Sequence, residues 1–220
     1  MYLGLGLGGR TESDYLFEVS RNRKDVYLLQ IGANDGRRND EASQFIHKYR
    51  WRGLLLEPLP DIFSALEDTY AQMKQVALVN AALADRDGEM TFYRVKPGPD
   101  IPDFCNQLGS FSLDTILEYR TTFPEIEQHI ITEKVQTLTF PTLIHRHGVE
   151  KIDVIVVDTE GYDYQILKML DLRQFRPALI MYEHNHLSEE ENHAAVQLLT
   201  DAGYDVHRIR NVNTAAVLRN

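Results

Sequence analysis

The sequence predicts an α/β fold in which helices cover both faces of a doubly wound, mostly parallel seven-stranded sheet that ends in a C-terminal antiparallel hairpin. Short apolar runs alternate with helix-length polar stretches, which is the pattern of βαβ units. Near the end of the chain, two strand-like runs flank Asn211-Val212-Asn213, which indicates the hairpin. With 220 residues and 43% hydrophobic content, the chain is expected to form one domain over 1–220.

The individual elements follow from hydrophobic periodicity and from helix-start signals. The run IDVIVV at 152–157 is the strongest strand pattern, and Ser188-Glu189-Glu190-Glu191 has the form of a capping box. In chain order the predicted elements are strand 27–31, helix 41–49, strand 53–56, strand 75–79, strand 135–138, helix 141–147, strand 152–157, helix 164–170, strand 178–182, helix 188–202 and the paired strands 204–209 and 215–218.

Two regions break the alternation. Asp87-Gly88 lies between Ala82-Leu83 and the strand-like run 90–93, which predicts a local antiparallel hairpin. Residues 96–134 contain four prolines and two glycines, and the segment is too long for a plain connector. Such an insertion is typical of a lid or a recognition loop.

The charge and composition of the chain limit the partners and compartments that we expect for it. A formal net charge of −10 opposes binding to nucleic acid, and no apolar run approaches the length of a membrane span. Cys105 is the only cysteine, which favours a reducing compartment. Residues 1–10 lack the basic start and the continuous apolar block of a signal peptide. We therefore expect a cytoplasmic protein without nucleic-acid partners, and a homo-oligomer is left open.

A glycine turn, QIGANDG, follows the first predicted strand at residues 30–36. Gly32 and Gly36 let the backbone bend and approach a ligand closely, while Asn34 and Asp35 offer acceptors to a cationic amino group. An ordinary strand-to-helix turn uses the same residue types. The dinucleotide-binding pattern would require glycine in place of Asn34, so a pyrophosphate cradle is disfavoured.

Glu57 ends the second predicted strand, roughly 20 residues beyond the glycine turn. At this position a doubly wound sheet places an acid that accepts hydrogen bonds from the two ribose hydroxyls. Together with the turn, Glu57 predicts a nucleoside-type ligand.

Acidic side chains also follow two later strands, at the edge where open α/β sheets bind ligands. Asp158 and Glu160 come after the strongest strand and can act as a proton acceptor, a metal clamp or a hydrogen-bonding pair for a cofactor. Glu183 and His184 follow the next strand, where the imidazole can act as a base that Glu183 orients. The competing interpretations are a helix cap and a solvated loop.

Four segments together resemble the FkbM-type methyltransferases: IGANDG, LLLEP, VALVNAAL and IDVIVVDTEGYDYQIL. The resemblance runs from about Val26 to Glu183. It implies S-adenosylmethionine as cofactor, a Rossmann-like methyltransferase fold, and methylation of a hydroxyl on a small molecule or sugar. Gln30 stands where the family frequently has aspartate, at the contact to the methionine amino end.

This interpretation assigns each candidate residue a role. Five residues of the glycine turn are expected to hold the methionine part of the cofactor, Glu57 the ribose, and the two residues after the third strand the adenine. The acids after the later strands are expected to contact the cofactor and flank the acceptor, with His184 as the base and without a metal. The expected cofactor contacts are Gln30, Gly32, Asn34, Asp35, Gly36, Glu57, Asn80, Ala81, Asp158 and Glu160, and the expected catalytic residues are His184, Asp158 and Glu183.

Three alternatives stay open. A divalent-metal-dependent methyltransferase would use Asp158, Glu160 and either Glu183 or His184 to chelate the acceptor hydroxyl. An NAD-dependent oxidoreductase would share the acid at Glu57, but the missing central glycine and the terminal hairpin oppose it. A non-catalytic nucleoside-binding module would keep the glycine turn and would not need the clustered acids.

Overall fold

The computed structural model describes residues 9–38, 40–210 and 212–219, and its main feature is a seven-stranded sheet in the order β10-β11-β9-β8-β1-β2-β3. Every strand of this sheet is parallel to the others except β11, which runs antiparallel to both of its neighbours. The predicted fold class is therefore confirmed. The strands are β1 (Tyr27–Ile31), β2 (Arg52–Leu56), β3 (Val76–Val79), β8 (Val154–Val157), β9 (Leu179–Glu183), β10 (Tyr204–Ile209) and β11 (Asn213–Leu218).

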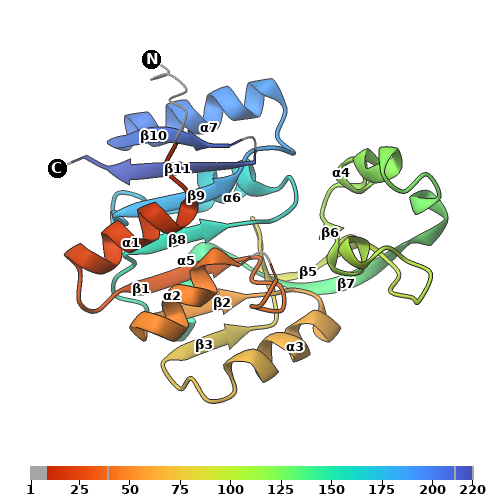
Figure 1. Cartoon of the computed structure of the whole chain (residues 1–220), viewed down its shortest axis with the longest axis horizontal. Helices are drawn as coiled ribbons and strands as arrows, with labels where there is room; N and C mark the ends of the chain where they lie inside the picture. The colour runs from red at the N-terminus through yellow and green to blue at the C-terminus, as the bar shows by residue number, and fades with distance from the viewer. Residues whose placement is uncertain (1–8, 39, 211, 220) are drawn as a thin grey trace.

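Helices cover both faces of the sheet because its buried strands are apolar on both sides (Figure 1). Leu28 packs with α1, α2 and α3, whereas the next residue, Leu29, packs with α5, α6 and α7 on the opposite face. The predicted capping box at Ser188 forms at the start of α7. The helices are α1 (Glu12–Asn22), α2 (Glu41–Tyr49), α3 (Pro60–Tyr70), α5 (Phe140–His147), α6 (Asp163–Met169) and α7 (Glu189–Asp201), of which α1 and α3 were not predicted.

A second, four-stranded sheet corrects the predicted hairpin at Asp87-Gly88. Its order is β4-β7-β5-β6, so the long strand β7 lies between the two segments that were expected to pair. Asp87 instead accepts hydrogen bonds from the Thr139 backbone N–H and the Thr142 hydroxyl, each at 2.7 Å, at the start of α5. The eight-residue antiparallel ladder between β5 and β7 outweighs the local turn signal. The strands are β4 (Ala82–Leu83), β5 (Gly88–Val95), β6 (Gly109–Ser110) and β7 (Ile130–Leu138).

Residues 96–134 form an insertion beyond the carboxyl ends of the parallel strands (Figure 1). The insertion contains β6, helix α4 (Leu113–Glu118), and the short 3₁₀ helices η1 (Asp103–Gln107), η2 (Tyr119–Thr121) and η3 (Ile126–His129). A small core that includes Cys105, Ile116 and Ile126 stabilises the insertion from within. It is therefore an ordered cover over the edge where ligands of such sheets bind.

Two expectations concern residues outside the described ranges. The absence of a signal peptide was predicted from residues 1–10, of which 1–8 are not described, and Asn211 of the confirmed hairpin is not described either. Among the described residues, no helix combines the length and apolarity needed to cross a membrane.

Candidate active site

Two adjoining cavities lie between the carboxyl ends of the parallel strands and the insertion. The first is lined largely by apolar and aromatic side chains, with Glu57 and several other polar groups among them. The second, of about 670 Å³, is lined mainly by polar and acidic groups. The residues that line both cavities mark the place where they meet: Gly32, Asn34, Gln107, Asp158 and Glu160. An elongated ligand that is apolar at one end and cationic at the other fits this arrangement.

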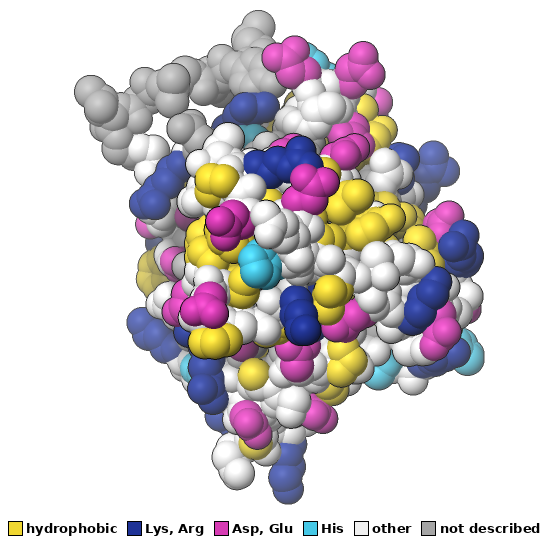
Figure 2. All heavy atoms as spheres, turned by 90° about the vertical axis from the view of Figure 1, so that its right-hand side faces the viewer, with side chains coloured by type: hydrophobic (Ala, Val, Ile, Leu, Met, Phe, Trp, Pro, Cys, Tyr) yellow, Lys and Arg dark blue, Asp and Glu magenta, His cyan; other side chains and the backbone are white. Residues whose placement is uncertain are grey.

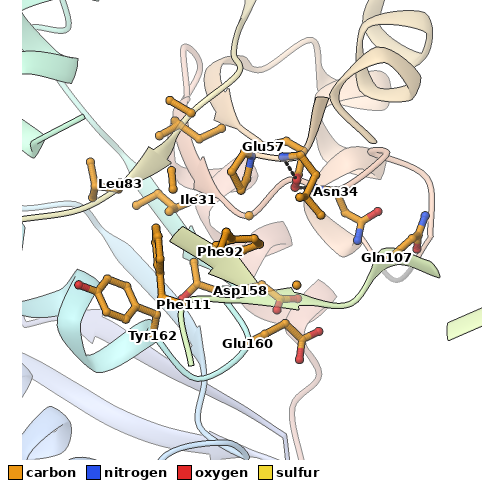
Figure 3. Close-up of a pocket in the computed structure, with 18 residues that line it drawn as sticks. Ile31, Asn34, Glu57, Leu83, Phe92, Gln107, Phe111, Asp158, Glu160 and Tyr162 are labelled. Carbon is orange, nitrogen blue, oxygen red and sulfur yellow. Dashed lines mark hydrogen bonds between the residues drawn. The ribbon is translucent and has the colours of Figure 1, made fainter. Parts of the chain in front are cut away.

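The first cavity has an aromatic wall that was not predicted as cofactor contacts. The Phe111 ring lies 4.9 Å from the Phe92 ring and 5.0 Å from the Tyr162 ring, measured between centroids. Figure 3 shows Phe111 and Tyr162 on the side of the pocket opposite Asn34 and Gln107. Because Phe92 and Phe111 come from β5 and the insertion, only their aromatic character marks them in the sequence.

Glu57 connects the glycine turn to the end of β2. Its Oε2 accepts a hydrogen bond from the Asn34 backbone N–H at 3.1 Å, and its Oε1 accepts one from the Leu59 N–H at 2.9 Å. Each carboxylate oxygen keeps a further acceptor position, and Glu57 lines the first cavity. Burial raises the pKa of Glu57 to about 7 despite these two hydrogen bonds.

The other predicted cofactor residues divide between the cavities and the surrounding support. Gln30 lines the second cavity and Ala81 lines the first. The Asn80 side chain donates to the Glu57 and Pro58 carbonyl oxygens at 2.9 and 3.1 Å, so Asn80 braces the chain after β2.

Asp35 and Gly36 line neither cavity. Asp35 accepts hydrogen bonds from the backbone N–H groups of Arg37 and Arg38 and from the Gln107 side chain, the last at 2.9 Å. Its carboxylate therefore ties the turn to the insertion, and the expected contact between Asp35 and the methionine amino group stays a prediction.

Asp158 lies at the junction of the two cavities. Its carboxyl accepts no hydrogen bond from any described residue, and its exposed surface opens into the cavities that it lines. The surrounding protein removes water from around the Asp158 carboxylate, and this loss of hydration is the largest cause that raises its pKa. Repulsion from Asp40 raises it further. It is a free carboxylate in a place where a ligand can reach it.

Glu160 and Glu183 lie beside Asp158 and line the second cavity. Glu160 accepts a hydrogen bond from the Tyr119 hydroxyl at 3.2 Å, which connects it to the insertion. The pKa values of Glu160 and Glu183 are both raised, chiefly because the two carboxyl groups are buried and further because the neighbouring acids repel them. The cluster thus carries more acidic groups than its surroundings neutralise.

The structure does not bring His184 to the cavities. Its ring is buried beneath β11, where Nδ1 lies 2.9 Å from the Thr214 hydroxyl oxygen, and burial lowers its pKa. The histidine that meets the acids is His186, whose Nε2 lies 3.3 Å from Glu160 Oε2. Sequence reasoning missed it because both histidines share one loop and only the packing against β11 distinguishes them.

Asp163 is a buried acid that supports the site without entering it. It accepts hydrogen bonds from the Thr159 hydroxyl at 2.8 Å and from the Glu183 backbone N–H at 3.1 Å, and it thereby joins the loop after β8 to the end of β9. Burial raises the pKa of Asp163 to about 7. Asp163 was not predicted as a site residue, although its position three residues after Glu160 in DTEGYD could have indicated it.

These buried acids predict that the ligand-free protein loses stability as pH rises. The pKa values of Glu57, Asp163 and Glu183 are raised in the folded state. From about pH 4.5 to beyond pH 7, the folded protein therefore holds more protons on these groups than the unfolded protein does. The free energy of unfolding therefore decreases through this range. In urea denaturation with a chelator present, we expect it to be at least ~2 kcal/mol lower at pH 8 than at pH 5.

Glu183→Gln should flatten this pH dependence because it removes one of the groups that must lose a proton in the folded state. Glu190→Gln, at an exposed position of α7, should leave the dependence unchanged. If the free energy of unfolding of the unmodified protein were the same at pH 5 and pH 8, the raised pKa values of these buried acids would be contradicted.

The chain is similar to known methyltransferases in sequence and in fold. Residues 30–206 match the model of the methyltransferase FkbM domain, and no curated protein sequence matches. A methyltransferase FkbM structure from Methylobacillus flagellatus is 12% identical with a TM-score of 0.56, over 94% of this chain and 48% of that one. This chain therefore spans about half of the Methylobacillus protein.

Two further structures show weaker likeness. A precorrin-6y C5,15-methyltransferase from Geobacter metallireducens is 12% identical with a TM-score of 0.49, over 99% of this chain and 94% of that one. Fibrillarin from Aeropyrum pernix, determined with natively bound S-adenosyl-L-methionine, is 13% identical with a TM-score of 0.45, over 88% and 68%.

Proposed function

Because this chain belongs to the FkbM family of methyltransferases, we propose that it transfers the methyl group of S-adenosylmethionine to a hydroxyl oxygen of a small molecule or sugar. The observation that carries the proposal is the pair of cavities that meet at Asp158. One cavity has an aromatic wall and contains Glu57, the acid directly after β2, and the other has several carboxylates in its lining. This pairing matches a nucleoside joined to a cationic amino acid.

The adenosine part fits the first cavity. Phe111 and Tyr162 supply apolar surface for the adenine, with Ala81 on the β3 side, and Glu57 accepts hydrogen bonds from the ribose hydroxyls. Asn34 is held beside the ribose position through its backbone bond to Glu57. We therefore retain Glu57, Asn34, Gly32 and Ala81 as cofactor contacts.

The methionine part fits the second cavity, near Gln30. The sulfonium and ammonium groups of the cofactor are cations, and Asp158 and Glu160 lie where the two cavities meet. Of the described residues that line the second cavity, Arg38 alone is a lysine or arginine. The uncompensated negative charge favours a cationic ligand.

The acceptor hydroxyl fits the remainder of the second cavity, where carboxylates can accept hydrogen bonds from it. Transfer requires the acceptor oxygen, the methyl carbon and the sulfur in line, so alignment supplies much of the acceleration. The oxygen–carbon bond forms as the carbon–sulfur bond breaks, and the acceptor proton passes to the free carboxylate of Asp158. The raised pKa of Asp158 strengthens it as a base.

The insertion is proposed to cover the reaction from water. Gln107 of η1 donates to Asp35, and the Ser110 hydroxyl of β6 donates to the Glu160 carbonyl oxygen at 2.7 Å. These two bonds attach the insertion to the turn after β1 and to the loop after β8. Excluding water strengthens the electrostatic interactions within the site.

On the outer face of the insertion, acidic and basic side chains are intermingled with hydrophobic ones (Figure 2). The concentration of acids in the second cavity therefore contrasts with the mixed charge of this face. A small acceptor that enters the cavity is the partner that fits best. The cytoplasmic location, the single domain and the open question of a homo-oligomer stay predictions.

Calorimetric titration with S-adenosylmethionine, its demethylated product and NAD tests the proposal. We expect saturable binding of both adenosyl ligands and none of NAD. Glu57→Gln should weaken binding of the adenosyl ligands at least ~10-fold, because the amide places a donor where the ribose hydroxyls and the Asn34 N–H need an acceptor.

Glu67→Gln provides the matched control for this substitution, since Glu67 is exposed on α3 and lines neither cavity. Its affinities should equal those of the unmodified protein. Binding of NAD alone would return the chain to the oxidoreductase alternative, and binding of neither nucleoside would support a module without this chemistry.

A further inference from the structure

We propose that Glu160, Glu183 and His186 bind one divalent metal ion beside the second cavity. One ligand atom of each residue lies within 4.8 Å of the ligand atoms of the other two. Glu160 lies in the loop after β8, Glu183 is the last residue of β9, and His186 lies in the loop after β9, so all three meet at the carboxyl edge of the sheet. The set includes His186 in place of the histidine that the sequence favoured.

The hydrogen bonding of His186 prepares one ring nitrogen for a metal. Nδ1 lies 2.8 Å from Oε2 of Glu118 in α4, and a carboxylate can only accept, so Nδ1 carries a proton. In the neutral ring Nε2 then presents its lone pair toward Glu160 and Glu183. A carboxylate that holds the outer nitrogen of a histidine is the usual support of a metal-bound imidazole.

The inner side of the cluster needs a positive charge. The Nε2 atom of His186 lies 3.3 Å from Glu160 Oε2 and 3.9 Å from Glu183 Oε2, and all three atoms are electron-rich in the neutral ring and the ionised acids. Glu183 Oε2 is also inaccessible to solvent and has no hydrogen-bond partner among the residues that the structure describes. Asn185 Nδ2 and the Tyr119 hydroxyl already lie 3.0 and 3.1 Å from Nε2, so a cation would replace these neutral groups there. It would also supply the partner that Glu183 Oε2 lacks among the described residues.

The ligand types indicate which cation fits. Two carboxylates suit Mg²⁺, Ca²⁺ and Mn²⁺, whereas an imidazole suits transition metals, so Mn²⁺ matches the mixed set better than Mg²⁺ does. Three protein ligands leave positions open for water or for oxygens of a substrate. If the proposed function holds, the ion would bind the acceptor hydroxyl and lower its pKa, and this role alone depends on that proposal.

Titration of the full chain with Mn²⁺, without cofactor, tests the site by calorimetry and by the electron paramagnetic resonance of free Mn²⁺. We expect one equivalent to bind, with Mg²⁺ binding at least ~10-fold more weakly. Glu183→Gln and His186→Gln should each weaken Mn²⁺ binding at least ~10-fold. The matched controls Glu190→Gln and His193→Gln change exposed residues of α7 and should bind as the unmodified protein does.

Thermal unfolding with and without Mn²⁺ checks that the variants remain folded, and only the unmodified and control proteins should be stabilised by the ion. Absence of saturable Mn²⁺ binding would overturn the metal site, and so would binding that survives both substitutions. Titration of the same proteins with S-adenosylmethionine keeps the two proposals apart. If the protein binds the cofactor but not the metal, only the metal-site proposal is contradicted. If it binds the metal but not the cofactor, only the proposed function is contradicted.

Discussion

Asp158→Asn is expected to lower the rate of methyl transfer at least ~100-fold while changing the affinity for S-adenosylmethionine only a few-fold. The amide keeps the shape of the side chain but cannot take the proton of a neutral hydroxyl. Asp158 is the expected base because its carboxyl faces both cavities and accepts no hydrogen bond from the described residues. Transfer of a labelled methyl group to a panel of sugars and polyols, combined with cofactor titration, measures both effects.

The pH profile separates a base from a purely structural role for Asp158. Because its pKa is raised, kcat of the unmodified enzyme should increase as Asp158 loses its proton, and Asp158→Asn should lack this acidic limb. Asp201→Asn, at an exposed position of α7, should keep both the rate and the profile. Full activity in Asp158→Asn would exclude Asp158 as the base.

Gly32→Ala is expected to lower the free energy of unfolding by about 3 kcal/mol or more and to abolish cofactor binding. Gly32 has a φ of +82°, and a Cβ atom there would overlap the backbone carbonyl oxygen of Asp158. The turn after β1 must therefore move away from the end of β8, which opens the junction of the cavities. Urea denaturation followed by far-UV circular dichroism measures the change in stability.

Gly148→Ala is the matched control, since Gly148 has a φ of +57° at the end of α5 and a Cβ atom there would meet nothing within 4 Å. It isolates the backbone cost of a positive φ, which is about 1 kcal/mol. If Gly32→Ala cost no more than this control, the close approach to Asp158 would not be what requires glycine.

The regular strands and most helices could be predicted because their signals are local. The sequence predicted β1 at Tyr27–Ile31 and α2 at Glu41–Tyr49 with the bounds that the structure has, since apolar periodicity and flanking turn residues identify such elements. The α1 and α3 helices were missed, although Thr11 caps the first and Pro60 begins the second. The predicted hairpin at Asp87-Gly88 was wrong because β5 pairs with β7, which follows the insertion in the chain.

The sequence by itself determined the seven-stranded sheet, the glycine turn, and the acids directly after β2 and β8, because consecutive residues decide where a buried parallel strand stops. Only the tertiary structure decided which side chains meet there. Packing against Thr214 of β11 withdraws His184, and contact with Glu118 of α4 brings His186 to the acids. These contacts join residues 30 and 68 positions apart, and no local pattern encodes such a pairing.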